Sequence, residues 1–536
     1  MSKLAWWQRG VVYQIYPRSF QDTSGNGVGD LQGVIERLDY LNDGTERSLG
    51  VDAIWLSPFY PSPMKDFGYD VSDYCDVHPL FGDLATFDRL VEEAHKRGIR
   101  IIIDYVPNHT SDEHPWFIES RSSRDNPKAD WYIWRDPKPD GSPPNNWGSV
   151  FGGPAWEWDE TRQQYYFHQF VVGQPDLNWR NPEVKAAMFD VLRFWLERGV
   201  DGFRMDVIGM IMKHPDMPDQ PWLTDADPNL PENAIYWRQE HIYDQDQEDV
   251  HAVLREMRAL LDEYGDTVGI GELFYSLPRW VKYYGENGDE LHLPFNFRLI
   301  DHLPVWDAQQ ARRIVDDVDG AVPPFGWPNY VLGNHDQPRV ASRFGAEQAR
   351  TAAMLLLTLR GTPTLYYGDE LGIPNGDIKP EQMVDPWGIQ MGVEYTRDVC
   401  RTPMQWDDSP YAGFSNVEPW LPVTPDYQTR NVAAQDKDER SMLNLYRRLL
   451  WYRKGSAPLY GGSYQAVDTP HADVFAYVRE ADGERVFVAL NFGDEERTVA
   501  TPSGGRLVLS TALDRSEGVM NAVKLRPYEG VIIELS

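Results

Sequence analysis

The feature that most constrains the fold is a recurring pair of elements, a short apolar stretch followed by an amphipathic helical stretch. About eight apolar stretches have the length and composition of strands; they lie at 11–17, 51–59, 99–107, 200–208, 267–274, 292–297, 328–336 and 362–370. Helical patterns such as 84–98 and 181–199 separate them, the second with Pro182 in its first turn. Parallel strands need crossover helices of this kind, and eight such units close into a barrel. The sequence therefore predicts an α/β fold, specifically a (β/α)8 TIM barrel.

Two regions break this alternation. Residues 105–177 are rich in Trp, Pro, Gly and Asn and are too long for a plain loop, which predicts a subdomain inserted after strand three. After about residue 460 the chain changes to short alternating strands, which predicts a C-terminal antiparallel β domain, expected to be a β sandwich. The predicted divisions are 1–104 and 178–459 for the barrel, 105–177 for the insertion and 460–536 for the last domain.

Composition limits the partners and the setting. The 536 residues carry a formal net charge of -32, which argues against nucleic acid or an anionic membrane as a partner and suits a neutral ligand. Acidity of this kind also fits a simple well-solvated surface. No signal-peptide core or run of 18 apolar residues is present, so we expect no membrane segment and a cytoplasmic monomer or small homo-oligomer. Cys75 and Cys400 alone make neither a disulfide framework nor a zinc motif, and we expect free thiols.

The stretch "GFRMD" (202–206) places two charges inside an apolar strand. Side chains two residues apart share one face of a strand, so Arg204 and Asp206 are expected side by side. A buried guanidinium favours the ionised form of a neighbouring carboxylate, so we expect Arg204 to lower the pKa of Asp206. An isolated pair of this kind fits a structural ion pair equally well.

The ends of the other strands enlarge this pair into a cluster. Reacting groups of such a barrel lie at the carboxyl ends of its strands. The residues found there are Asp104, Asn108, His109, Arg204, Asp206, Glu272, Asn334, His335 and Asp336. Each alone fits a helix cap or a turn, but together they bring acids and imidazoles to one face.

Such a cluster suits glycoside hydrolysis, which needs one carboxylate as nucleophile and one protonated carboxyl group as acid. Glu272 has no basic neighbour in the sequence, so we expect it to stay protonated. The sequence contains no phosphate-binding glycine loop, no GxSxG serine elbow and no HExxH zinc helix.

Four of these motifs, "DYVPNH", "GFRMD", "GEL" and "GNHD", resemble the core motifs of the α-amylase family of glycoside hydrolases, family 13. "QPDLNW" (174–179), "GYDVSDY" (68–74) and "RTPMQW" (401–406) resemble its α-glucosidase and oligo-1,6-glucosidase branch. The resemblance implies hydrolysis with retention of the α anomer by double displacement. It implies Asp206 as nucleophile, Glu272 as acid/base and Asp336 as the third acid.

The resemblance also implies a set of substrate-binding residues. Arg204, His109 and His335 match ligands around the reacting sugar. Asp66, Tyr69 and Arg401 match residues that hold the non-reducing glucose and make the enzyme exo-acting.

Three further positions are expected at the entrance. Phe151 and Phe170 match aromatics that line it, with packing inside the subdomain as the alternative. Val207 follows the nucleophile, where valine often accompanies cleavage of α-1,6 links, although it can also simply pack the strand end.

The stretch "DTSGNGVGD" (22–30) resembles the family's calcium loop, which usually has Asn at its third position and Asp at its fifth. The expected oxygen ligands are Asp22, Ser24, Asn26, Val28 and Asp30. With fewer carboxylates than usual, a structural Ca²⁺ ion and a metal-free turn both stay open. No organic cofactor is expected.

The resemblance thus implies an exo-acting α-glucosidase that releases glucose from disaccharides and short oligosaccharides with α-1,6 and α-1,4 links. A transglucosidase or isomerase, such as a trehalose synthase or sucrose isomerase, is the alternative. A non-catalytic relative, such as a transporter heavy-chain ectodomain, is disfavoured because the three acids are present and no anchor is seen.

Overall fold

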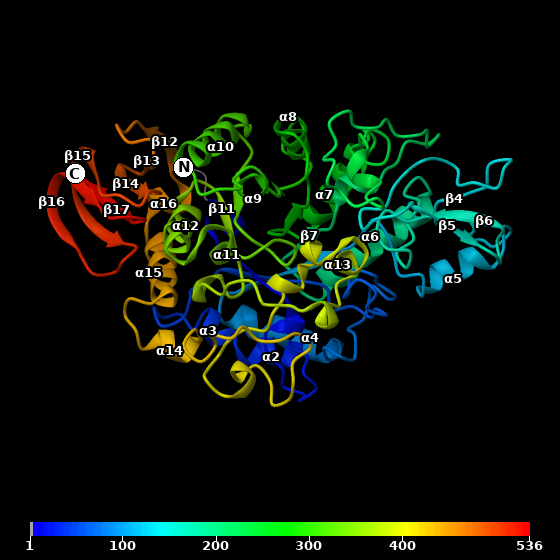
Figure 1. Cartoon of the computed structure of the whole chain (residues 1–536), viewed down its shortest axis with the longest axis horizontal. Helices are drawn as coiled ribbons and strands as arrows, with labels where there is room; N and C mark the ends of the chain where they lie inside the picture. Colours follow the sequence, from blue (N-terminus) through cyan, green and yellow to red (C-terminus); the bar gives the residue numbers. More distant parts are fainter. Residues whose placement is uncertain (1–3) are drawn as a thin grey trace.

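Eight parallel strands form the centre of the molecule (Figure 1), as the sequence predicted. The computed structural model describes residues 4–536. The strands are β1 (Val12–Ile15), β2 (Ala53–Leu56), β3 (Arg100–Tyr105), β7 (Gly202–Met205), β8 (Val268–Gly271), β9 (Leu293–Pro294), β10 (Asn329–Val331) and β11 (Thr362–Tyr366). They pair in the order β10-β11-β1-β2-β3-β7-β8-β9, which is a nearly closed TIM barrel.

The two end strands of this order, β9 and β10, do not pair with each other, and side chains bridge the seam between them. Asn329 accepts a hydrogen bond from the backbone N–H of Asn296 (2.9 Å) and donates one to the carbonyl of Pro294 (2.6 Å). Asn296 donates its side-chain amide to the carbonyl of Asn329 (3.0 Å). Pro294 has no N–H for a strand ladder, so two buried amides take over part of its role.

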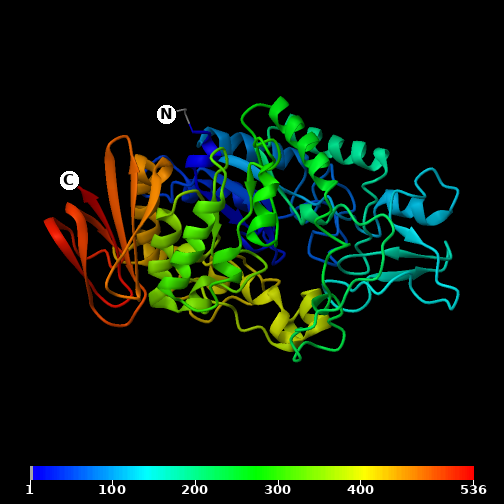
Figure 2. The ribbon, with the colours of Figure 1, turned by 90° about the horizontal axis from the view of Figure 1, so that it is seen from above.

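Helices surround the barrel (Figures 1 and 2). The main ones are α2 (Leu31–Glu36), α4 (Leu84–Lys96), α6 (Pro182–Glu197), α7 (Val250–Glu263), α10 (Ala308–Ala321), α12 (Ala346–Thr358) and α15 (Met442–Gly455). Polar side chains cap their first turns: Asp83 accepts from the N–H of Thr86 at α4, and Asn181 accepts from Glu183 at α6, where Pro182 is the first residue. Buried residues of these helices pack on the strands in one large apolar core.

A small antiparallel sheet lies between β3 and β7 in the chain and at one end of the molecule (Figure 1). It contains β4 (Trp134–Arg135), β5 (Trp156–Asp159) and β6 (Gln164–Phe167), and α5 (Pro115–Ser122) precedes it. Its core includes Met217 from a second irregular segment, 211–249, between β7 and α7. That second segment was not foreseen from the sequence. The exact domain boundaries stay predictions.

The C-terminal β domain lies at the opposite end (Figures 1 and 2). Its strands are β12 (Ser463–Val467), β13 (Val474–Ala481), β14 (Glu484–Asn491), β15 (Arg497–Ser510), β16 (Glu517–Leu525) and β17 (Gly530–Leu535). They form one continuous antiparallel sheet, because β17 pairs with both β14 and β15, and residues of β13 to β17 share one apolar core; the expected β sandwich stays a prediction. Bulges in β15 allow this sheet to bend.

Two further expectations concern cysteines and membranes. Cys75 and Cys400 are both free thiols, as predicted. Among residues 4–536, none of the helices has the length and apolarity needed to cross a membrane.

The seam between β9 and β10 generates a stability prediction. Asn329→Ala should lower the free energy of unfolding by about 2–4 kcal/mol, because it leaves the N–H of Asn296 and the carbonyl of Pro294 buried without partners. Urea unfolding followed by fluorescence measures this loss. Asn229→Ala, at an exposed turn, is the control and should change little. Equal midpoints for the two variants would show that the side chains do not hold the seam.

Candidate active site

One buried guanidinium joins three carboxylates from neighbouring strands. Arg204 of β7 contacts Asp104 of β3 through Nη1 (2.7 Å), Asp206 through Nη1 (2.6 Å) and Glu272, directly after β8, through Nη2 (2.6 Å). The Arg204 side chain is 1 % exposed. The shared face predicted for Arg204 and Asp206 is confirmed. Glu272 has no basic neighbour in the sequence, but Arg204 of the adjacent strand contacts it in the fold.

Burial sets the protonation of these acids. Burial raises the pKa of Asp206, and the neighbouring Glu272 adds to the rise, so the lowering by Arg204 is outweighed. Burial likewise raises the pKa of Glu272. It raises the pKa of Asp104 to about 6. Arg204 therefore acts on Asp206 in the expected direction but does not decide the result. Asp206 and Glu272 therefore both give up a proton less readily than free carboxylic acids do.

Asp336 has the opposite environment. Burial opposes its ionisation, but His335 (3.1 Å), Arg397 (3.1 Å) and Arg401 (2.8 Å) together hold the pKa of Asp336 well below its usual range. The site thus combines one carboxyl group whose pKa is lowered with two whose pKa values are raised. Acids whose pKa values are driven apart are typical of acid/base sites.

These groups open onto a cavity of about 520 Å³. The predicted residues that line it are Asp66, Tyr69, His109, Phe151, Phe170, Asp206, Val207, Glu272 and Asp336. Arg204, His335 and Arg401 do not line it but lie directly behind, where they contact the lining acids. His335 bonds the hydroxyl of Tyr69 through Nε2 (2.7 Å), and the two rings stack with centroids 5.3 Å apart.

Arg397 lines the cavity at the place where Arg401 was expected. Its Nη2 contacts Asp66 (2.8 Å) and Asp385 (2.6 Å), and its Nη1 contacts Asp336 (3.1 Å). Arg401 instead donates from Nε to the carbonyl of His335 (2.8 Å). The two arginines are four residues apart in "RDVCR" (397–401), and nothing in that spacing showed which one faces the cavity.

A buried ion pair supports the same end of the cavity. Lys213, from segment 211–249, contacts Asp176 of the "QPDLNW" stretch (2.6 Å). Gln174 of that stretch donates to Asp66 (3.1 Å) and lies 3.1 Å from Nε2 of His109. Burial and the charge of Lys213 lower the pKa of His109 to about 3, so its imidazole is neutral at physiological pH.

The outer part of the cavity is aromatic. Trp387 of α13 (Pro386–Met391) stacks on Trp237 with ring centroids 5.8 Å apart and on Phe151 with centroids 5.7 Å apart. Phe274, also in the lining, is 50 % exposed. Trp387, Trp237 and Phe274 were not predicted as site residues. Trp387 lies in a short helix and the other two lie in irregular segments, and the sequence pattern does not give the position of any of these in space.

Val207 connects the two central acids through its backbone. Its N–H donates to Oε2 of Glu272 (3.0 Å), and its φ of 35° is in the left-handed region. A β-branched residue rarely adopts this conformation, and such strain is found where a site depends on it. The backbone thereby aims one donor at Glu272.

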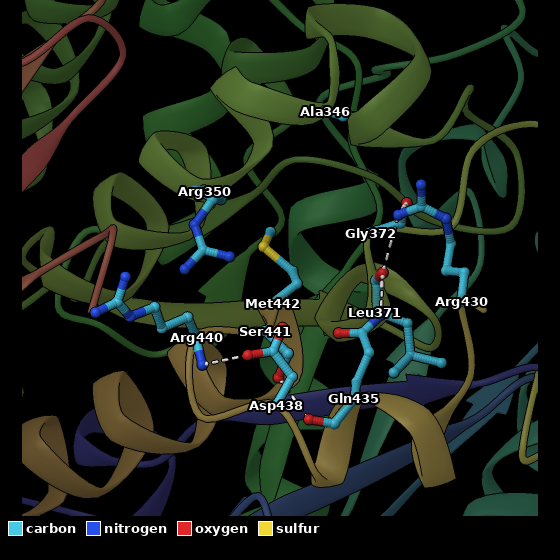
Figure 3. Close-up of a pocket in the computed structure, with 10 residues that line it drawn as sticks. All are labelled: Ala346, Arg350, Leu371, Gly372, Arg430, Gln435, Asp438, Arg440, Ser441 and Met442. Carbon is cyan, nitrogen blue, oxygen red and sulfur yellow. Dashed lines mark hydrogen bonds between the residues drawn. The ribbon is translucent and has the colours of Figure 1, made fainter. Parts of the chain in front are cut away.

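A second cavity, of about 270 Å³, lies at the start of α15 and includes three arginines (Figure 3). They do not converge on one point in Figure 3. Arg430 is bonded to Asp426 (2.6 Å) and to the carbonyl of Gly372 (2.8 Å), and Arg350 donates to the carbonyl of Thr511 (2.8 Å). We assign no chemistry to this cavity.

Loop 22–30, which resembles a calcium loop, is held by hydrogen bonds from donors inside the loop and from Ser415. Asp22 accepts hydrogen bonds from the N–H groups of Gly25 (2.8 Å) and Gly27 (2.9 Å) and from the hydroxyl of Ser415 (2.6 Å). Asp30 caps α2 by accepting from Gly33 (2.7 Å). Within residues 4–536, no three His, Cys, Asp or Glu side chains are grouped as metal ligands. Both carboxylates of the loop already accept hydrogen bonds from the protein, and the other expected ligands are neutral, so the donor set suits Ca²⁺ poorly; calcium binding stays a prediction.

The loop's composition predicts how it responds to calcium. The double variant Ser24→Asn with Asn26→Asp restores the usual donor set by adding a carboxylate and an amide oxygen. Millimolar CaCl₂ should therefore raise the melting temperature of this variant more than it raises that of the parent chain. Differential scanning calorimetry with CaCl₂, and with EDTA as control, measures the difference. If neither chain responds to Ca²⁺, the loop is a metal-free turn.

Comparisons with known proteins agree with this geometry. The profile of the alpha-amylase catalytic domain matches residues 14–462, and that of the alpha-amylase SusG C-terminal domain matches residues 474–532. A probable alpha-glucosidase of Rhizobium meliloti (strain 1021) is 45 % identical over 512 residues, covering 93 % of this chain and 91 % of that protein. An oligo-1,6-glucosidase of Heyndrickxia coagulans is 40 % identical over 572 residues, covering 99 % of each.

Solved structures add close matches of the whole fold. An alpha-glucosyl transfer enzyme has a TM-score of 0.92 at 41 % identity, with 100 % of both chains covered. The trehalulose synthase of Pseudomonas mesoacidophila MX-45 has a TM-score of 0.89 at 37 % identity, again with 100 % of both chains covered. The matched domains, the relatives and the arrangement of acids show that the chain belongs to the alpha-amylase family of glycoside hydrolases, as its motifs predicted.

Proposed function

We propose that the protein is a retaining, exo-acting α-glucosidase that releases α-glucose from disaccharides and short oligosaccharides. The observation that carries the proposal is the contact of Arg204 with both Asp206 and Glu272, because it holds a nucleophile and an acid beside one point of the cavity. The names of two relatives, an alpha-glucosidase and an oligo-1,6-glucosidase, support it.

The proposed reaction has two steps. A carboxylate oxygen of Asp206 attacks C1 of glucose while the bond from C1 to the leaving oxygen breaks, and Glu272 gives its proton to that oxygen. Glu272 then takes a proton from water, whose oxygen attacks C1 and displaces Asp206. Two inversions leave the product in the α configuration. Glu272, whose pKa is raised by burial, supplies the proton, and Arg204 stabilises the carboxylate of Asp206.

The exo preference is supported by the other end of the cavity. Asp66 and Arg397 are buried and joined by an ion pair (2.8 Å), and Arg397 also contacts Asp336. C4 of glucose lies across the ring from C1, so its hydroxyl is placed against these groups. A longer chain on C4 would have to displace the buried ion pairs, which favours substrates whose first sugar is terminal.

Transfer of glucose to another alcohol is a second candidate. Many groups at the mouth are apolar, and the polar Gln239 and His241 already use both ends of their side chains in internal hydrogen bonds. Such a mouth can hold an acceptor by its apolar faces and compete with water. One solved relative is an alpha-glucosyl transfer enzyme, and another is a trehalulose synthase. Product analysis on sucrose, maltose and isomaltose at low and high concentration separates hydrolysis, transfer and isomerisation.

The two acids generate a prediction about leaving groups. Asp206→Ala should lose most activity on every substrate. Glu272→Gln should lower kcat/KM on isomaltose by about 10²–10⁴-fold, but much less on 4-nitrophenyl α-glucoside, whose leaving group needs little protonation. Steady-state kinetics on both substrates, with exposed Asp225→Ala as control, test this. Equal losses for Glu272→Gln on both would remove it as the acid, and β-glucose as the first product by NMR would exclude retention.

Val207 generates a prediction about linkage. Its side chain lines the cavity beside Asp206, where the second sugar must lie, and it offers that sugar no hydroxyl. We expect isomaltose to be cleaved at least as well as maltose. Val207→Thr should shift the ratio of their kcat/KM values toward maltose by about 10-fold, because a hydroxyl in such a contact is worth about 1–3 kcal/mol. A strong wild-type preference for maltose that the substitution does not change would contradict this reading.

A further inference from the structure

Arg18 is a buried guanidinium that contacts aromatic rings instead of acids. It lies in the turn η1 (Pro17–Ser19) after β1 and is 6 % exposed. Among residues 4–536, no carboxylate lies within ion-pair distance of it, although the charge of Asp70 acts on it from farther away, and its Nε has no hydrogen-bond partner. Its guanidinium carbon lies 4.9 Å from the ring of Phe67 and 4.6 Å from the ring of Trp420. Burial of a charge that has no counter-ion in direct contact costs free energy. An apolar side chain would therefore serve a purely packing role better.

Phe67 belongs to the loop 61–70, which carries Asp66 to the cavity. Two non-glycine residues of this loop adopt the left-handed conformation, Met64 (φ 63°) and Phe67 (φ 47°), and Asp66 lies between them. Such a conformation persists only when surrounding contacts impose it. The carboxylate of Asp70 supplies one set, by accepting from the N–H groups of Lys65 (2.8 Å) and Asp66 (3.0 Å).

The Ser62 hydroxyl also accepts from the N–H of Met64 (2.9 Å), and a further set of contacts comes from Arg18. Besides the ring of Phe67, its Nη1 lies 3.6 Å from Sδ of Met64, so Arg18 touches both strained residues. Trp420 also packs on Phe67, with the two ring centroids 5.4 Å apart. Trp420 is itself fixed, since its indole N–H donates to the hydroxyl of Ser19 (3.0 Å) and its backbone N–H to the carbonyl of Gly27 (2.9 Å). Arg18 and Trp420 thus form an anchored surface on which the loop rests.

We propose that Arg18, supported by Trp420, is a positioning residue that holds the strained loop 61–70 so that Asp66 meets the C4 hydroxyl of the terminal glucose. This inference rests on the proposed α-glucosidase function and concerns the selection of a terminal glucose by its C4 hydroxyl. Arg18 does not line the cavity, so its effect reaches the sugar only through Asp66.

A comparison of two substrates isolates this role. 4-Nitrophenyl α-glucoside carries the C4 hydroxyl, and its 4-deoxy analogue does not. Arg18→Met should lower kcat/KM on the glucoside by about tenfold or more, as for a lost hydrogen bond to a charged group, and leave the 4-deoxy analogue nearly unchanged. Much of this loss should appear as a higher KM rather than as a lower kcat. In an Asp66→Asn background, Arg18→Met should have little further effect on the glucoside.

Matched variants exclude a general loss of stability. Arg37 packs its guanidinium 4.0 Å from the ring of Trp406, away from the loop 61–70, so Arg37→Met should leave the substrate ratio unchanged. Phe67→Leu and Trp420→Leu remove the two aromatic rings that contact Arg18, both at half-buried positions. Each should change the ratio of kcat/KM on the two substrates as Arg18→Met does. These variants provide the test if Arg18→Met folds poorly.

The outcomes are distinct. An inactive wild-type protein on 4-nitrophenyl α-glucoside would overturn the proposed function itself. An active wild type, with folded Arg18, Phe67 and Trp420 variants that lower activity on both substrates equally or on neither, would overturn the positioning role alone. A selective loss on the glucoside that disappears in the Asp66→Asn background would support it.

Discussion

The Arg204 guanidinium is the charge on which the site depends. It is buried in the strand β7 and contacts Asp104, Asp206 and Glu272, each within 2.7 Å. A buried cation is costly to desolvate, and three carboxylates more than neutralise it. Burial raises the pKa values of Asp206 and Glu272, and the contacts with Arg204 oppose this rise without cancelling it. Burial therefore favours a protonated acid in this cluster, while Arg204 stabilises the ionised partner.

The barrel makes this arrangement possible because neighbouring parallel strands end at the same face. Arg204 lies directly opposite Asp104 in the pairing of β3 with β7, and Glu272 follows the residue paired with Met205 in β8. The charges are thus one strand spacing apart, close enough for direct contact. The strained backbone of Val207 adds a hydrogen bond to Glu272 from the turn that follows. Irregular segments then enclose this rigid centre and shape the mouth.

Much of this could be predicted from the sequence, for physical reasons. Apolar strands punctuated by polar residues indicated all eight barrel strands, and the two-residue period of a strand correctly placed Arg204 beside Asp206. Contacts between strands were beyond such reasoning, as the approach of Arg204 to Glu272 shows. Arg401 was chosen because it belongs to the motif "RTPMQW", and Arg397 was missed because it precedes that motif in a turn-rich segment with no period that selects a face. Segment 211–249 was not foreseen, because its Met217 packs against residues of the small sheet that are distant in sequence.

The central claim is that Asp206 forms a covalent bond with the sugar. Incubation with 5-fluoro-α-glucosyl fluoride, a slow substrate that accumulates such an intermediate, followed by peptide mass spectrometry, tests it most directly. The account predicts one fluoroglucosyl group on the peptide that contains Asp206, and none in Asp206→Ala. Attachment to Glu272 or another residue, or turnover of the reagent without any attachment, would contradict it.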